Sequence, residues 1–262
     1  QGRPENAISS YERAIGINPD IAEIHRNLGI VLQELGRTED AIVSLEKSLS
    51  INPDYAEAHN NLGLSLQVLD QHRGAISCFE RALAINTDFA EAYNNLGVAQ
   101  YKLDQYKNAI SNYENALKIK PDFAETYFNM GIVLNDLRQH EDAIRYYEQA
   151  LAIKPEYLDA FYNLAALYEK LNQLEQANIY VQKVLQLQVD EPRAKKLEAV
   201  LLRREEKYME ALDILKSISL INMDAETISS IYFEMGKLYD LVGDSDSAMQ
   251  HIREGNRVQA DS

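Results

Sequence analysis

The sequence is poor in the residues that build disulfides, zinc sites and nucleic-acid interfaces. One cysteine, Cys78, is present among 262 residues, so an intrachain disulfide and a cysteine-based zinc site are both excluded. Lysine and arginine number 26 against 41 aspartate and glutamate residues, and the formal net charge is −15. This balance disfavours non-specific binding of nucleic acid or of an anionic membrane. No apolar run reaches the roughly 18 residues that cross a bilayer.

Constellations for catalysis or cofactor binding are also missing from the sequence. The five histidines form no ligand cluster. The dipeptide Gly236-Lys237 lacks the upstream glycine and the Ser or Thr of a phosphate-binding loop. We therefore expect no metal, no cofactor and no enzymatic activity. With a single cysteine, a reducing, cytoplasmic compartment is the default expectation.

The chain does contain a strict period. Alanine recurs every 34 residues, at Ala7, Ala41, Ala75, Ala109, Ala143, Ala177 and Ala211. A fixed period of this length predicts stacked units, each of which contacts mainly its neighbours. Function is then expected on a long surface rather than in a closed pocket. Because the chain opens with Gln1 partway through a unit, the sequence is also compatible with a signal peptide lost upstream.

Each unit reads as two helices joined by a short break such as Asp104-Gln105-Tyr106. Prolines predict where one unit ends and the next begins, at Pro19, Pro53, Pro121 and Pro155, with Thr87 in the remaining slot. Two acids follow, three residues apart, in a pattern that resembles a capping box: Asp20 and Glu23, Asp54 and Glu57, Asp88 and Glu91, Asp122 and Glu125, Glu156 and Asp159. We expect first helices to begin near residues 21, 55, 89, 123 and 157.

Small residues recur in the first helices, where the two helices of a unit are expected to approach most closely. They are Gly29, Gly63, Gly97, Gly131, Ala165 and Ala199. A glycine inside a helix costs about 1 kcal/mol relative to alanine, so its recurrence indicates that a side chain would clash. Large residues form a matching series in the second helices, at Tyr11, Leu45, Phe79, Tyr113, Tyr147, Val181 and Leu215.

Together the period, the small and large positions and the closing proline resemble the tetratricopeptide repeat (TPR). Segments such as Ala92-Tyr93-Asn94-Asn95-Leu96-Gly97 carry the resemblance, which covers nearly the whole chain. It implies an all-α, right-handed superhelix of antiparallel helix pairs, whose first helices line a concave groove that binds proteins or peptides. We expect the second helix of a truncated repeat (1–21), five regular repeats (22–191), a degenerate sixth with a three-residue insertion (192–228) and a seventh (229–262).

An asparagine ladder is the sharpest candidate for a binding site. Its members are Asn27, Asn61, Asn95, Asn129 and Asn163, again 34 residues apart. An amide offers one acceptor and two donors, so it can bind both the C=O and the N–H of an extended peptide. The ladder resembles that of the repeat superhelix in O-linked N-acetylglucosamine transferases, although asparagine is also simply common at this position of the family. Flanking candidates are Arg26, Asn60, Asn94, Tyr101, Phe128 and Tyr162.

Local basicity is confined to the sixth repeat. Arg193, Lys196, Arg203 and Arg204 are candidates for docking an anion or a neighbouring domain, although interspersed acids also fit a solvated face.

Two alternatives to a scaffold that binds proteins or extended peptides stay open. The segment from Tyr232 to Asp240 resembles the last repeat before the catalytic domain in bacterial repeat–sulfotransferase fusions, so the chain fits the recruiting arm of a sulfotransferase or glycosyltransferase. A homo-oligomer, joined through the apolar faces of the terminal repeats, is the other.

Overall fold

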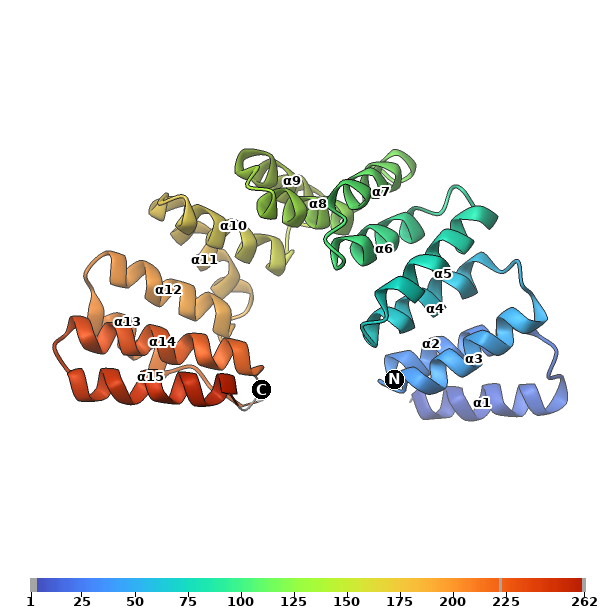
Figure 1. Ribbon diagram of the computed structural model, residues 1–262, viewed down its shortest axis with the longest axis horizontal. Coiled ribbons are helices and arrows are strands. Elements are labelled where there is room, and N and C mark those ends of the chain that lie inside the picture. Colours follow the sequence, from blue (N-terminus) through green and yellow to red (C-terminus); the bar gives the residue numbers. More distant parts are fainter. Residues whose placement is uncertain (1–3, 222, 261–262) are drawn as a thin grey trace. The chain divides into compact units, whose positions relative to one another are not determined.

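The computed structural model describes residues 4–221 and 223–260, which form helices and no strands (Figure 1). The helices are α1 Pro4–Ile17, α2 Ala22–Glu34, α3 Thr38–Ile51, α4 Ala56–Val68, α5 His72–Ile85, α6 Ala90–Tyr101, α7 Tyr106–Ile119, α8 Ala124–Asp136, α9 His140–Ile153, α10 Leu158–Lys170, α11 Leu174–Leu187, α12 Pro192–Arg204, α13 Tyr208–Lys216, α14 Ala225–Leu241 and α15 Ser245–Ala260. The predicted all-α class is confirmed.

Helices end where the prolines predict. Four helices end two residues before a proline, and α5 ends at the same place before Thr87, at Ile85. Within each pair, a left-handed residue such as Gly36 or Asp104 lies two or three residues beyond the end of the first helix, and it lets the next N–H donate a hydrogen bond back to that helix. The N–H of Gln105 donates to the C=O of Gln100 over 2.9 Å, a Schellman closure. Equivalent bonds close the other described pairs.

The predicted capping boxes are wrong for the regular repeats. First helices begin one residue later than expected, and their N-cap residues, Ile21, Tyr55, Phe89 and Tyr157 among them, make no side-chain cap bond. The first acid of each predicted pair lies in the preceding turn, where the N–H of Asp54 donates to Oδ1 of Asn52 over 3.2 Å, and the second acid, such as Glu57, lies in the first turn of the helix. Carboxylate caps occur later in the chain, where Glu191 accepts from the N–H of Ala194 and Asp224 from the N–H of Thr227.

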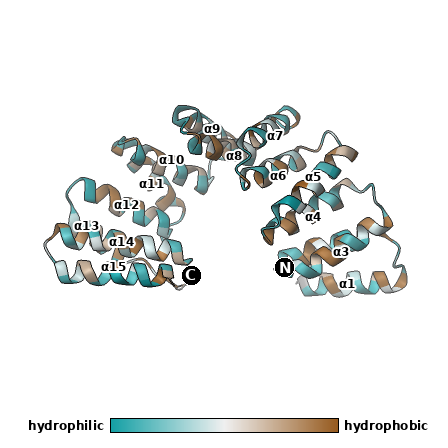
Figure 2. Ribbon diagram, in the orientation of Figure 1, coloured by the Kyte–Doolittle hydropathy of each residue, from teal (hydrophilic) through white to brown (hydrophobic). Residues whose placement is uncertain are grey.

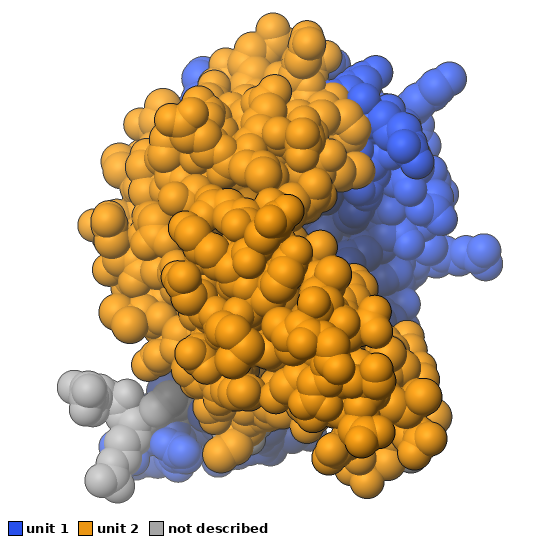
Figure 3. Space-filling view, turned by 90° about the vertical axis from the view of Figure 1, so that its left-hand side faces the viewer, with its two compact units in different colours: residues 1–139 blue, residues 140–262 orange. Residues whose placement is uncertain are grey.

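The chain divides into two compact units, residues 1–139 and 140–262 (Figure 3). Within each unit, every helix packs on the next one along the chain. First helices also pack directly on one another, α2 to α4 to α6 to α8 in unit 1 and α10 to α12 to α14 in unit 2. Among the described residues, second helices make no comparable contacts with each other, so the first helices form the shorter side of each unit. We call this side the inner face.

The core of a pair forms where a small residue meets a large one. A Cβ added to Gly97 would lie 2.5 Å from Cε1 of Tyr113, and one added to Gly63 would lie 2.5 Å from Cε1 of Phe79. Both aromatic rings are fully buried. The glycines thus let the first helix approach the ring of the second helix, as the sequence predicts. Each helix carries both hydrophobic and hydrophilic residues, as its amphipathic packing requires (Figure 2).

The degenerate sixth repeat still forms two helices. Leu197 and Leu201 supply the buried face of α12, while the half-buried Glu198 accepts a bond of 2.9 Å from Nε2 of Gln182. The second helix, α13, is the shortest in the chain's described part, with nine residues. Beyond it, Ile218 folds back into the core formed by α12, α13 and α14.

Candidate functional site

The asparagine ladder lies on the inner faces of the two units. Asn27, Asn61, Asn95 and Asn129 belong to α2, α4, α6 and α8 in unit 1, and Asn163 belongs to α10 in unit 2. All five residues are half-buried. Each therefore keeps a part of its side chain accessible to a ligand.

Two ladder residues are held by asparagines of the preceding repeat. Nδ2 of Asn95 donates to Oδ1 of Asn60 over 3.0 Å, and Nδ2 of Asn129 donates to Oδ1 of Asn94 over 3.0 Å. Oγ1 of the buried Thr126 donates to the same Oδ1 of Asn94, also over 3.0 Å. These bonds tie α4 to α6 and α6 to α8, and they fix the plane of each donating amide.

The flanking residues Asn60 and Asn94 therefore have a different place from the one expected. They are 6% and 1% exposed, respectively, so they lie beneath the ladder rather than beside it. The side-chain oxygen of each residue accepts a hydrogen bond, so this polar atom has a partner although it is buried. Each of these acceptors lies 35 residues before its donor, which is one repeat plus one residue. A search for residues that recur every 34 positions therefore does not find the pairs.

The other three ladder residues have separate surroundings. Asn61 makes no side-chain hydrogen bond within the described residues. Oδ1 of Asn27 accepts from a guanidinium nitrogen of Arg26 over 3.0 Å. Nδ2 of Asn163 donates over 2.8 Å to the C=O of Asp159, one turn earlier in α10.

Aromatic candidates also lie half-buried on first helices. Tyr101 donates from its hydroxyl to Oδ2 of Asp136 over 2.6 Å, which joins α6 to α8. Burial, followed by this bond to a carboxylate, raises the pKa of Tyr101 above its ordinary value. Tyr162 of α10 lies under the guanidinium of Arg193, 4.8 Å from the ring centroid. Phe128 lies in α8, next to Asn129 in sequence.

The acids at the start of the first helices make inter-repeat contacts. Glu91 accepts from Nζ of Lys120 over 2.9 Å. Burial acts to raise the pKa of Glu91, but the bond and charge of Lys120 outweigh it and leave the pKa lowered. The pair is substantially exposed, so its contribution to stability is small.

Three of the four basic candidates in the sixth repeat are already paired. Arg193 binds Glu191 over 2.8 Å and Asp159 over 3.1 Å, and Arg204 binds Glu169 over 2.6 Å. Arg203 binds Glu234 over 2.5 Å. Lys196 is half-buried, and burial lowers its pKa. A ligand anion would compete with protein carboxylates at all three arginines.

Glu234 is a residue that the sequence reasoning missed. Once the three-residue insertion is counted, it occupies the ladder position in α14, and it is buried. Its carboxylate accepts from Arg203 of α12 and from Lys237 over 3.4 Å. In unit 2, an ion pair thus joins α12 to α14, whereas a hydrogen bond between two side-chain amides joins α6 to α8 in unit 1.

Searches for other kinds of site are negative in the part of the chain that the structure describes. No group of three or more His, Cys, Asp or Glu side chains there is arranged to hold a metal ion. No helix in the described ranges combines the length and apolar character needed to cross a membrane.

Several solved structures resemble this fold. The structure of MamA is 30% identical and covers 59% of this chain and 90% of its own, with a TM-score of 0.54. PilF of Pseudomonas aeruginosa is 22% identical over 89% of this chain and 97% of its own, with a TM-score of 0.68. YrrB, described as a TPR protein with an unusual peptide-binding site, is 23% identical over 75% of this chain and 97% of its own, with a TM-score of 0.54. No curated protein matches the chain.

Family models match most of the sequence. A tetratricopeptide repeat model matches residues 20–88, 54–122 and 88–156. A second tetratricopeptide repeat model matches residues 134–201, and a TPR repeat model matches residues 1–36. The helix pairs, the small-to-large packing and these matches agree. The chain therefore belongs to the tetratricopeptide repeat family.

Proposed function

We propose that the chain is a non-catalytic scaffold that binds an extended segment of another protein along the inner face of unit 1. The observation that carries the proposal is the amide ladder of Asn61, Asn95 and Asn129. Two of these amides are fixed by bonds to a buried residue, and the third is unbonded within the described residues. YrrB, a relative in fold, is described as having a peptide-binding site, which supports the same class of ligand.

Each oriented amide keeps hydrogen-bonding capacity for a ligand. Asn129 uses one N–H on Asn94, which leaves its second N–H and its side-chain oxygen for other partners. A peptide backbone presents alternating C=O and N–H groups, and an amide can satisfy one of each. Because backbone groups are common to all sequences, the ladder would select an extended conformation more than a sequence.

The expected affinity is modest. A hydrogen bond of this kind contributes about 0.5–1.5 kcal/mol net, so a few amides contribute a few kcal/mol before the ligand is ordered. This places binding in the micromolar range or weaker. Side-chain preference would come from half-buried neighbours such as Tyr101 and Phe128. In this proposal Asn60 and Asn94 support the ladder and do not contact the ligand.

The test measures binding of labelled extended peptides to the triple variant Asn61→Ala, Asn95→Ala, Asn129→Ala. We expect loss of binding, and unchanged binding would refute the proposal. The triple variant also removes the donors to Asn60 and Asn94, so it is expected to lose some stability. The single variant Asn61→Ala removes no protein hydrogen bond, and it should weaken binding while the melting temperature stays the same.

A further inference from the structure

The amide ladder is the middle one of three parallel rows on the inner face of unit 1. Four residues before each asparagine lies an exposed glutamate, and three residues after it lies a half-buried apolar residue. Residues at these spacings share one face of a helix. We call the flanking rows the acid row and the apolar row. The acid row is Glu23, Glu57, Glu91 and Glu125, and the apolar row is Ile30, Leu64, Val98 and Ile132.

The packing of the first helices sets the step from one member of a row to the next. Neighbouring first helices of unit 1 contact each other directly. The bonds of Asn95 to Asn60 and of Asn129 to Asn94 hold α4, α6 and α8 together at the ladder itself. Because the axes of packed helices lie about 8–10 Å apart, each row offers an equivalent group at about this interval to a ligand that crosses the helices.

A polyproline II helix matches this step, whereas a β-strand does not. Polyproline II advances about 3.1 Å per residue, so a turn of three residues spans about 9 Å and returns the chain to the same orientation. A β-strand returns to the same orientation after two residues, about 7 Å, or after four, about 14 Å. Its C=O and N–H groups would therefore lose register with the amides from one repeat to the next. Polyproline II has no internal hydrogen bonds, so its backbone groups are free to bind them.

The three sides of such a ligand meet different surroundings. When the ligand lies along the amide ladder, one side chain of each turn points towards the apolar row, one towards the acid row and one away from the protein. An apolar side chain would remove more of Leu64 and its equivalents from water. Within the described residues, Glu23 and Glu57 make no side-chain hydrogen bond or ion pair, whereas Glu91 is paired with Lys120. A basic ligand side chain would supply the missing partner.

We propose that the inner face of unit 1 binds a polyproline II segment of another protein, with an apolar residue at every third position and a basic residue on one neighbouring side. The inference rests on the proposed function, because it specifies the ligand of the same amide ladder. Free proline-rich segments already populate this conformation, so they lose less conformational entropy on binding than a disordered chain does.

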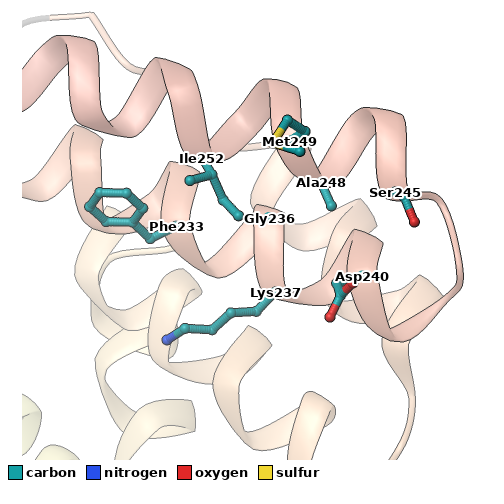
Figure 4. A pocket seen from close by; sticks show the side chains of 8 residues that line it. All are labelled: Phe233, Gly236, Lys237, Asp240, Ser245, Ala248, Met249 and Ile252. Atoms are coloured by element: carbon teal, nitrogen blue, oxygen red, sulfur yellow. The ribbon is translucent and has the colours of Figure 1, made fainter.

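The apolar cavity on the hairpin α14–α15 lacks such rows. Its volume is about 730 Å³, and Phe233, Met249 and Ile252 are among the residues that line it (Figure 4). Its lining comes from the two helices of one hairpin, and nothing in the structure shows what covers it. We therefore assign no ligand to this cavity.

Synthetic peptides test the period of the ligand. A labelled peptide of four Leu-Pro-Lys triplets, one for each first helix of unit 1, is titrated against the full chain by fluorescence polarisation. A second peptide has the reverse order, Lys-Pro-Leu, because each order suits one of the two directions along the ladder. The control peptide has the same composition, but its leucines and lysines alternate and its prolines lie at the ends.

We expect at least one triplet peptide to bind about tenfold more tightly than the alternating control. A control that binds equally well or better would overturn the inference. Triplet peptides that do not bind at concentrations up to about 1 mM would overturn it as well.

A charge reversal tests the acid row. Glu57 is exposed and has no side-chain bond in the described structure, so Glu57→Lys should fold. It should weaken the Leu-Pro-Lys peptide about tenfold and should favour a Leu-Pro-Glu peptide. The matched control is Glu80→Lys, which makes the same change at an exposed residue of the second helix α5. Equal effects of both variants would show attraction to the overall negative charge and would contradict the assignment.

A nearly isosteric change tests the apolar row. Val98→Thr replaces a methyl group with a hydroxyl group, so it should weaken the Leu-Pro-Lys peptide and leave a Ser-Pro-Lys peptide unchanged. Val43→Thr is the control, because Val43 is 66% exposed and lies on the second helix α3. Equal losses for the two peptides with Val98→Thr would contradict a contact between leucine and this row.

The triple Asn→Ala variant separates this inference from the proposed function. It should lose the triplet peptides and the alternating peptide alike. If the unmodified chain binds both kinds equally and the triple variant binds neither, the proposed function stands and only the polyproline II inference fails. Triplet binding that the triple variant retains would instead refute the function of the amides.

Discussion

The side-chain amide of Asn129 donates over 3.0 Å to Oδ1 of Asn94, which lies one repeat earlier and is almost completely buried. The bond joins a half-exposed residue of the inner face to a residue of the interior. It gives Asn129 two functions at once, since the amide links α8 to α6 and still offers groups to a ligand. Asn61 has the same place in its repeat but lacks such a bond in the described structure.

This difference predicts different effects of the same substitution. Asn129→Ala leaves Asn94 with one donor fewer, so the free energy of unfolding should fall by about 0.5–1.5 kcal/mol. Asn61→Ala should leave stability unchanged. Urea unfolding of the two variants checks this, and equal losses would show that the bond contributes nothing.

The contact between Gly97 and Tyr113 predicts a steric effect. Gly97→Leu places a side chain where Cε1 of Tyr113 lies 2.5 Å from the new Cβ, so we expect a loss of about 1–3 kcal/mol by overpacking. Gly16 of α1 has no atom within 4 Å of an added Cβ, so Gly16→Ala should be neutral or stabilising. Thermal melting distinguishes the two, and a Gly97→Leu variant that melts normally would refute the packing.

The left-handed turn residues predict a gain from glycine. Glu206 has a φ of 61°, a conformation that costs a residue with a Cβ about 1–2 kcal/mol. Glu206→Gly should therefore raise the free energy of unfolding by about 1 kcal/mol. The reverse change at an equivalent turn, Gly36→Ala, should lower it, because Gly36 has a φ of 73° and no steric contact. We expect chemical denaturation to give changes of opposite sign in the free energy of unfolding for these two variants.

The ion pair of Arg203 and Glu234 predicts a strong coupling. Arg203→Leu leaves the buried carboxylate with only the more distant Lys237, so a loss of about 1–3 kcal/mol is expected. Replacing both residues with leucine should cost much less than the sum of the two single changes, because no buried charge remains. A double-mutant cycle measures the coupling, and additive effects would argue against it.

The thiol of Cys78 predicts a pH-dependent reactivity. Burial, with a smaller contribution from the charge of Glu46, raises its pKa from 9.0 to about 11. The thiol is therefore protonated at neutral pH, and only the thiolate reacts with iodoacetamide. Alkylation of the folded chain should be slow at neutral pH and should rise up to about pH 11. Urea-unfolded chain should react faster at neutral pH, and equal rates would contradict the burial.

The sequence by itself determined the architecture. The 34-residue period, the prolines and the small-to-large positions predicted the helix pairs and their packing, because each depends on local backbone geometry and on contacts within one repeat or its neighbour. Glycines such as Gly97 had to lie opposite large residues such as Tyr113, since both recur in the same register. The family followed from the same positions.

Tertiary structure alone decided how the polar residues are used. Acids that resemble N-caps, such as Asp54, lie in the turns before the first helices, because each helix begins one residue later and an asparagine such as Asn52 accepts the hydrogen bond of the turn. The partners of Asn95 and Asn129, the ion pair of Glu234 and the exposure of Ile252 depend on which helix lies alongside. Hydrogen bonds and burial are set by distances between helices, and a repeat pattern does not specify them.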